Sequence, residues 1–253
     1  MCLLFDITNK TVVITGASQG IGKEIAFFLA KKGANIALIA RNSGKLENIV
    51  NELRSAGHES IAISQDLKKV SELNKTMKKI YDFFGSIDIL INNAGVNIAK
   101  PAERITENDW DNVIDINLKS AFFCCQAAGD YLKKSNNGKI ITMSSQMAKV
   151  GYYDRVAYCS SKGGVTQLTK SLAVEWAREK INVNAIAPTF IKTPMTESMF
   201  EDKEFKRNVL NKIPLGRLAT IQDLLGTVLF LSSHSSDMIT GQTIYVDGGW
   251  TIW

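Results

Sequence analysis

The chain has 253 residues, of which 45% are hydrophobic and 22% are charged, and its formal net charge is +5 at pH 7. This composition is ordinary for a globular protein with a substantial core, and the length fits one large α/β domain. No apolar run is long enough to span a membrane, and the first six residues are too short and too soon acidic for a signal peptide. We therefore expect a cytoplasmic protein without membrane contact.

The positive charge does not indicate a nucleic-acid partner. The lysines are scattered, and pairs such as Lys31-Lys32 and Lys133-Lys134 stand before expected helix ends, where cations offset the helix dipole. No basic block is interleaved with aromatic residues. The four cysteines and two histidines lack the spacing of a zinc site or a disulfide framework, so no metal is expected.

Apolar runs typical of buried strands alternate with helical patterns along the whole chain. The strands are expected at residues 11–15, 35–40, 60–64, 87–91, 138–143, 181–186 and 242–246. The helices are expected at residues 20–32, 43–56, 69–84, 106–131 (with a break near Asn117), 154–179, 194–210 and 220–232. Such continuous apolar strands indicate a parallel sheet covered on both faces. Residues 1–253 are therefore predicted to form one doubly wound α/β domain with about seven strands.

A glycine-rich turn joins the first strand to the first helix, with the sequence Gly16-Ala17-Ser18-Gln19-Gly20-Ile21-Gly22. Glycines permit a tight turn, and the amides and dipole of the following helix N-terminus favour the pyrophosphate of a dinucleotide. The spacing is G-x-x-x-G-x-G, and such a turn alone could be a simple tight connection. Its place after the first strand of a parallel sheet favours cofactor binding.

The end of the second strand points to the type of cofactor. A free ribose 2′-hydroxyl favours an acidic residue at this place, whereas a 2′-phosphate favours an arginine. Ala40 offers no carboxylate, and Arg41 can pair with a phosphate. The sequence therefore predicts NADP(H), with NAD(H) as the alternative if Arg41 only reaches solvent.

Tyr158 and Lys162 are four residues apart in the helix expected at residues 154–179, so they lie one turn apart on the same face. An ammonium near a phenol favours the phenolate. Lowering the tyrosine pKa from about 10 to about 7 takes roughly 4 kcal/mol, which a lysine and a cofactor charge could provide together. The pair indicates that Tyr158 is a general acid/base for interconverting a carbonyl and an alcohol. The alternative is an exposed amphipathic helix with an ordinary Tyr and Lys.

Together these motifs resemble those of the short-chain dehydrogenase/reductase family. The matching pieces are residues 15–22, Asn92-Asn93-Ala94-Gly95, Ile116-Asn117-Leu118-Lys119-Ser120, Ser145, Tyr158, Lys162, Pro188 and Val246-Asp247-Gly248-Gly249-Trp250. The resemblance covers nearly the whole chain. It implies a Rossmann-fold oxidoreductase that acts on CH–OH groups with NAD(P) and a small-molecule substrate. It also implies a homotetramer that packs through the helices at 106–131 and 154–179.

The resemblance implies a catalytic set of Asn117, Ser145, Tyr158 and Lys162. Ser145, thirteen positions before Tyr158, would hydrogen-bond the substrate oxygen, and Tyr158 would pass the proton. Lys162 would bind the nicotinamide ribose and lower the pKa of Tyr158. Asn117 would hold a water that extends the proton relay; otherwise it only marks a helix kink.

The same resemblance implies a set of cofactor contacts. They are Gly16, Ser18, Gln19, Gly20, Ile21, Gly22, Arg41, Asp66, Leu67, Asn93, Ala94, Gly95, Tyr158, Lys162, Pro188 and Thr193. Asp66 could instead be a helix cap. One departure is Thr189, which stands where many relatives have glycine and adds a side chain near the nicotinamide.

Two types of substrate agree with the sequence. Similarity to gluconate 5-dehydrogenases and deoxygluconate dehydrogenases implies a sugar acid or polyol. Substrate contacts would then come from Ser145 and Tyr158, with Arg155 or Lys100 receiving a carboxylate unless both are solvated rim charges. The alternative is a 3-oxoacyl-acyl-carrier-protein reductase, whose acidic carrier the net positive charge would attract.

A third class is a non-catalytic nucleotide-binding sensor or scaffold, against which the complete catalytic set argues. The segment at about 190–212 follows the sixth strand and is rich in Met, Phe and charged residues. These features favour a lid over the substrate, with a static pair of surface helices as the alternative.

Overall fold

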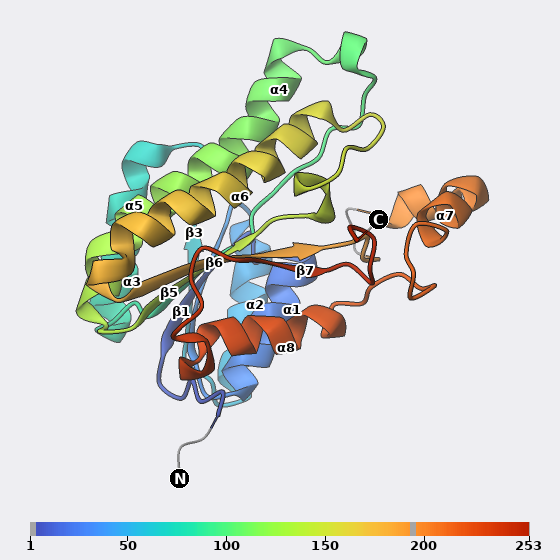
Figure 1. Cartoon of the computed structure of the whole chain (residues 1–253). Helices are drawn as coiled ribbons and strands as arrows, with labels where there is room; N and C mark the ends of the chain where they lie inside the picture. The colour runs from blue at the N-terminus through green and yellow to red at the C-terminus, as the bar shows by residue number, and fades with distance from the viewer. Residues whose placement is uncertain (1–3, 193–195, 253) are drawn as a thin grey trace.

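Seven parallel strands form a single sheet in the computed structural model, which describes residues 4–192 and 196–252 (Figure 1). The strand order is β3-β2-β1-β4-β5-β6-β7. The strands are β1 (Thr11–Thr15), β2 (Asn35–Ala40), β3 (Ser60–Ser64), β4 (Ile89–Asn92), β5 (Gly138–Met143), β6 (Ile181–Pro188) and β7 (Thr243–Val246). The prediction of a doubly wound parallel sheet is confirmed.

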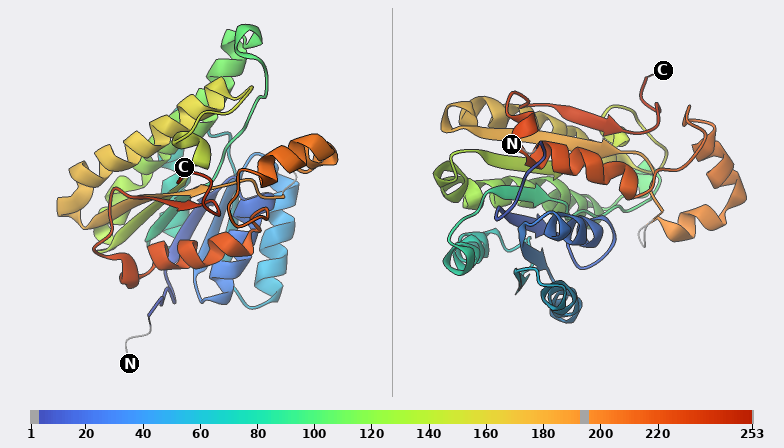
Figure 2. Two further views of the ribbon diagram at one scale, coloured as in Figure 1. Left: turned by 45° about the vertical axis from the view of Figure 1, so that its right-hand side comes forward. Right: turned by 90° about the horizontal axis from the view of Figure 1, so that it is seen from below.

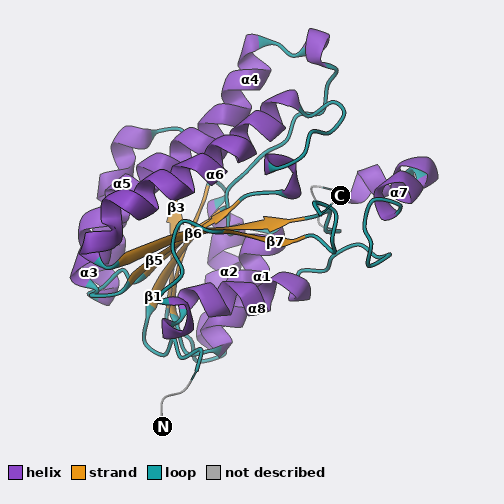
Figure 3. Cartoon of the chain, viewed as in Figure 1, coloured by secondary structure: helices purple, strands orange, loops and turns teal. Residues whose placement is uncertain are grey.

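Helices cover both faces of this sheet (Figures 1 and 3). They are α1 (Gly20–Lys31), α2 (Ser43–Ser55), α3 (Leu73–Phe84), α4 (Glu107–Ile114), α5 (Ser120–Lys134), α6 (Val156–Trp176), α7 (Lys203–Leu210) and α8 (Gln222–Ser232). Successive side chains of a strand point to opposite faces. Val12 and Ile14 of β1 therefore join the core beneath α1, α2 and α8, whereas Val13 joins the core beneath α3, α5 and α6. None of the described helices has the length and apolar composition of a membrane span.

The strand order changes direction beside β1, which pairs with β2 on one side and with β4 on the other. At such a switch point the loops after the two strands diverge, and a crevice opens at the carboxyl ends. α7 lies beyond this end of the sheet in Figure 1 and in both views of Figure 2. The fold thus brings the loops after the strands to one edge and places α7 beside that edge.

The helix expected at 106–131 is two α-helices joined by a π-helical turn at Asp115–Lys119, and it continues to Lys134. The predicted break near Asn117 is therefore confirmed. The helix expected to begin at 154 begins at Val156. Asp154 has a φ of 56°, a left-handed conformation that cannot continue into a helix.

The segments expected as helices at 69–84 and 194–210 are each divided. The first has a 3₁₀ turn at Val70–Glu72 before α3, and the second has a 3₁₀ turn at Glu197–Glu201 before α7. Asp202 separates the latter two elements because its carboxylate accepts hydrogen bonds from the first amides of α7, at Glu204 and Phe205.

Candidate active site

A pocket of about 910 Å³ lies at the carboxyl ends of the strands and is lined by residues that follow β1 through β6. Most of the predicted site residues line it. These are Gly16, Ser18, Gln19, Gly20, Ile21, Arg41, Asp66, Leu67, Asn93, Ala94, Gly95, Ser145, Arg155, Tyr158, Lys162 and Pro188. Gly22, Lys100 and Asn117 are not among the lining residues, and Thr193 lies outside the described residues.

The glycine-rich turn is locked against the loop after β4. Gly16 has a φ of 65°, and a Cβ there would come within 2.7 Å of the Cα of Ala94. The side-chain nitrogen of Asn93, Nδ2, donates to the backbone carbonyls of Thr15 and Gly16, at 3.1 and 3.2 Å. A Cβ at Gly22 would lie 2.5 Å from that same nitrogen. Glycine at this position therefore leaves room for the Asn93 side chain, although Gly22 itself does not line the pocket. Gln19 caps α1 without a side-chain hydrogen bond, which leaves the first amides of the helix open to an anion.

Two cations stand at the end of the pocket formed after β2. Arg41 and Lys45 are exposed and line it, and neither pairs with a carboxylate within the described residues. The Lys45 ammonium donates to Gln19 Oε1 at 3.0 Å, which links this end to the glycine-rich turn. Asp66 lines the pocket, and its Oδ1 accepts from the Lys68 amide at 3.1 Å. This contact lies in a turn, and the next helical element begins only at Val70 with Lys69 as its N-cap, so Asp66 is not the helix cap that the alternative predicts.

The residues expected to react meet after β5. Ser145 directly precedes the 3₁₀ turn Gln146–Ala148, and its Oγ accepts a hydrogen bond from the Met147 amide at 3.2 Å. Tyr158 and Lys162 lie one turn apart on α6, and the Lys162 ammonium is 5.6 Å from the centre of the Tyr158 ring. Lys162 Nζ donates to the Met143 carbonyl at 2.7 Å. The structure thus brings Ser145, Tyr158 and Lys162 together.

Asn117 lies in the π-helical turn and ties three segments together. Its Nδ2 donates to the Val96 carbonyl at 2.9 Å and to Ser161 Oγ at 3.0 Å, and its Oδ1 accepts from the Val96 amide at 2.8 Å. A Cβ at Gly95 would lie 3.4 Å from Asn117 Oδ1 and 3.6 Å from Lys162 Nζ. Asn117 therefore approaches Lys162 across Gly95, although both of its amide protons are already donated.

The two cations predicted to receive a carboxylate differ in their surroundings. Arg155 is only 7% exposed, lines the pocket and donates to the Asp154 carbonyl at 3.0 Å. Its guanidinium pairs with no carboxylate of the described chain. Lys100 instead forms an ion pair with Asp109 at 2.6 Å. The assignment of Lys100 as a substrate contact is therefore not supported, because its ammonium is neutralised outside the pocket lining.

An aromatic cluster adjoins the pocket through Phe190. The ring of Phe190, which lines the pocket, lies 5.7 to 6.0 Å from the rings of Phe200, Phe205, Tyr152 and Trp250. The segment expected to be a lid thus packs against the C-terminal residues of the chain. Movement of this segment as a lid stays a prediction.

Comparisons with known proteins identify this arrangement. A family model described as enoyl-(acyl carrier protein) reductase matches residues 16–251. The chain is 41% identical to the 3-oxoacyl-acyl-carrier-protein reductase of Staphylococcus aureus over 242 residues, which cover 95% of this chain and 98% of the relative. It is 37% identical to the 2-dehydro-3-deoxy-D-gluconate 5-dehydrogenase of Escherichia coli over 247 residues, 97% of each chain. The chain belongs to the short-chain dehydrogenase/reductase family.

A solved structure of this family supports the same assignment. The gluconate 5-dehydrogenase of Burkholderia cenocepacia, in complex with NADP and tartrate, superposes with a TM-score of 0.96 at 30% identity and covers 99% of this chain and 98% of that one. The present short-chain dehydrogenase/reductase is accordingly an enzyme that acts on CH–OH groups with NAD(P).

Burial perturbs both ionisable groups of the Tyr158–Lys162 pair in this enzyme. Desolvation raises the pKa of Tyr158 to about 12, although a hydrogen bond with Ser145 lowers it in part. Burial lowers the pKa of Lys162 to about 8. The direction for Tyr158 is opposite to the expected one, because in the chain alone desolvation of the phenol outweighs its favourable interactions.

Several pocket residues were missed by sequence reasoning. They include Lys45, Asn97, Gln146 and Met147. Lys45 stands four residues after Arg41, and Gln146 directly follows Ser145, so chain proximity to a predicted residue was a usable signal for both. Phe190 and Met199 also line the pocket, and both belong to the segment at about 190–212 that was expected to lie over the substrate.

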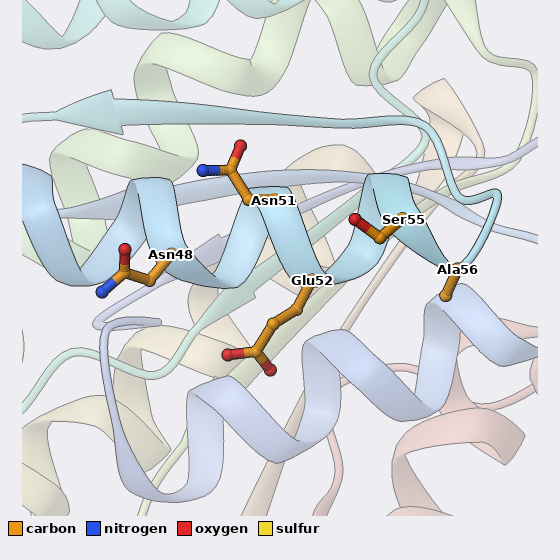
Figure 4. Close-up of a pocket in the computed structure, with 5 residues that line it drawn as sticks. All are labelled: Asn48, Asn51, Glu52, Ser55 and Ala56. Carbon is orange, nitrogen blue, oxygen red and sulfur yellow. The ribbon is translucent and has the colours of Figure 1, made fainter.

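Two other features of the described chain do not compete with this site. A depression of about 670 Å³ lies on α2 (Figure 4), but its lining residues, Asn48, Asn51, Glu52, Ser55 and Ala56, are all exposed and come from that helix and its C-cap. In the part of the chain that the structure describes, no group of three or more His, Cys, Asp or Glu side chains could hold a metal ion.

Proposed function

We propose that this enzyme interconverts a secondary alcohol and a ketone of a sugar acid or related polyol, of the gluconate type, with NADP(H). Arg155 carries the proposal. A guanidinium that is buried in the pocket without a carboxylate partner favours an anionic ligand, because a buried charge is costly until it is paired. Two relatives are named as sugar-acid dehydrogenases, and one of them was solved with tartrate, a hydroxylated dicarboxylate.

In the proposed reaction the Ser145 hydroxyl turns its proton from Gln146 Oε1 to the carbonyl oxygen of the ketone and holds that oxygen beside Tyr158. The Tyr158 hydroxyl then gives its proton to that oxygen as the alcohol forms, and takes it back in the reverse direction. Lys162 binds the cofactor ribose, and Asn117 holds a water that extends the path by which a proton returns to Tyr158. When bound, the nicotinamide supplies or accepts the hydride.

The residues present fit a phosphorylated dinucleotide. The open amides at the start of α1 favour its pyrophosphate, and the close approach of Gly16 to Ala94 keeps side chains out of the turn. Arg41 and Lys45 would hold a 2′-phosphate, since they are the cations that line the end of the pocket after β2.

Replacing Arg41 with alanine is expected to lower kcat/KM for NADPH by about 10- to 100-fold and to change that for NADH by less than about 2-fold. This range corresponds to the loss of a charge-assisted hydrogen bond to phosphate. Steady-state rates with each cofactor at low concentration measure it, and Arg178→Ala, an exposed arginine beyond α6, is the control. A wild-type enzyme that prefers NADH would contradict the NADP(H) assignment.

Replacing Arg155 with methionine is expected to lower kcat/KM for gluconate about 100-fold while changing that for glucitol, which lacks the carboxylate, by less than about 3-fold. The lost interaction is a charge-assisted pair in a desolvated place. The two substrates are compared with NADP⁺ as acceptor. An equal loss of kcat/KM for both substrates would show that Arg155 supports the structure of the pocket but does not bind the carboxylate.

A 3-oxoacyl-acyl-carrier-protein reductase is the second candidate. The 41% identity to such an enzyme favours it, and Met147, Phe190 and Met199 offer apolar surface to an acyl chain. Sugar acids, polyols and β-ketoacyl thioesters should therefore be assayed together by the absorbance of the reduced nicotinamide. Turnover of the thioesters alone would replace the sugar-acid proposal, and binding of cofactor without any turnover would favour a non-catalytic sensor.

The expected homotetramer stays a prediction. Val156 and Val174 leave apolar surface exposed on α6, and Trp110 does so on α4, which supports packing of these helices against another subunit. The cytoplasmic location and the single-domain organisation of residues 1–253 also stay predictions.

A further inference from the structure

Gln146 is a buried polar residue beside the reaction centre that has no role in the proposed chemistry. It directly follows Ser145, begins the 3₁₀ turn Gln146–Ala148 and lines the pocket. Only 2% of it is exposed. A carboxamide carries one acceptor oxygen and two donor protons, so the partners of these atoms define what the residue can bind.

The acceptor side of Gln146 faces Ser145. Ser145 Oγ donates its proton to Gln146 Oε1 at 3.2 Å, while its oxygen accepts from the Met147 amide. In this arrangement Oε1 faces the serine and the amide nitrogen points away from it.

The donor side of Gln146 has no partner in the described chain, although the residue is almost completely buried. Among the described residues the Gln146 amide nitrogen is not one of the fully buried atoms that lack a partner, so it keeps some accessible surface, and the residue borders a pocket that a ligand can fill. The oxygen and nitrogen of one carboxamide are separated by a single carbon. The free donor therefore lies next to the position at which Ser145 would hold the reacting oxygen.

The loops after the two neighbouring strands also carry polar side-chain atoms without hydrogen-bond partners. Asn97, after β4, and Thr189, after β6, each line the pocket and each have a buried side-chain oxygen without a partner in the described chain. Gln146 stands between them, after β5. Three adjacent loops thus bring polar side chains with unpaired atoms to the lining of the pocket. A few such polar groups are what orients a hydroxylated ligand in a pocket.

We propose that Gln146 determines specificity by donating a hydrogen bond to a hydroxyl on the carbon next to the reacting carbon. The substrate is then an α-hydroxy ketone and, in the reverse direction, a vicinal diol. This inference rests on the proposed function and narrows its substrate class.

The test uses two ketone acids that differ only in this hydroxyl, 6-hydroxy-5-oxohexanoate and 5-oxohexanoate, with NADPH. The wild-type enzyme is expected to prefer the hydroxylated acid by about tenfold in kcat/KM, the size of one hydrogen bond. Gln146→Met is expected to reduce this preference to within about twofold. Gln146→Glu keeps the acceptor for Ser145 but lacks the donor, and should lose the preference as well.

Gln167→Met, a substitution of an exposed glutamine on α6, is the matched control and should keep the wild-type preference. A Gln146→Met variant that loses the same factor on both acids would overturn the inference, since Gln146 would then act only through Ser145. Dissociation constants of the two acids for the enzyme with NADP⁺, measured by calorimetry, give the same ratio independently of turnover. Absent turnover would refute the proposed function, whereas equal dissociation constants would refute the role of Gln146.

Discussion

Tyr158→Phe is expected to lower kcat by about 10³-fold while leaving the affinity for NADPH within about twofold of the wild-type value. The substitution removes the hydroxyl that passes the proton, and general acid–base catalysis typically contributes 10² to 10⁴ in rate. The phenyl ring stays in place among the residues of the aromatic cluster. Ketone reduction measures kcat, and fluorescence titration measures the cofactor affinity.

Tyr153 provides the control for this experiment. It is 83% exposed and lies five residues before Tyr158, so Tyr153→Phe should leave both quantities unchanged. Activity of Tyr158→Phe at the wild-type level on the true substrate would refute the proton-transfer role.

Lys162→Met should abolish measurable turnover and at the same time stabilise the fold by about 2 kcal/mol at pH 7. Burial lowers the pKa of Lys162 from 10.5 to about 8, so holding its charge in the folded state costs about 3 kcal/mol. Methionine has a similar length and removes this cost. The lost hydrogen bond to the Met143 carbonyl opposes the gain by about 1 kcal/mol.

The pH dependence of this effect has a defined sign. Between about pH 8 and 10.5 the folded protein has released the Lys162 proton and the unfolded chain still holds it, so wild-type stability rises with pH relative to that of Lys162→Met. The difference should therefore be largest at pH 7 and fall to about zero by pH 10, where the remaining charge cost no longer exceeds the lost hydrogen bond. Urea denaturation of both proteins at pH 7 and pH 10 measures it, and a gap that does not shrink would contradict the assigned cause.

Local sequence patterns were sufficient for the strands and for the loops that follow them. The apolar run of β1 and the glycines after it are interpretable without tertiary information, because strand burial and a φ of 65° at Gly16 restrict the residue type at each position. The helix break near Asn117 was also predictable. Its form as a π-helical turn was not, because that form depends on hydrogen bonds to Val96 and Ser161, which are distant in the chain.

The ionic state of the site could not be predicted from residue spacing. Tyr158 and Lys162 lie one turn apart as expected, but burial of the phenol determines the direction of its pKa. Lys100 and Arg155 were equivalent candidates in the sequence. Folding brings Asp109 to Lys100 and buries Arg155 in the pocket, and this difference depends on contacts between segments that the sequence does not place relative to each other.

The sequence by itself determined the parallel sheet, the glycine-rich turn and the Tyr158–Lys162 pair, because each depends on periodicity or on spacing along one segment. The addition of Ser145 to this pair came from the family resemblance. Only the tertiary structure decided which cation faces the pocket and that Gln146 has a free donor there. These properties depend on burial and on partners supplied by other segments. A residue's neighbours along the chain limit its local conformation, but its neighbours in space determine what its polar atoms remain free to bind.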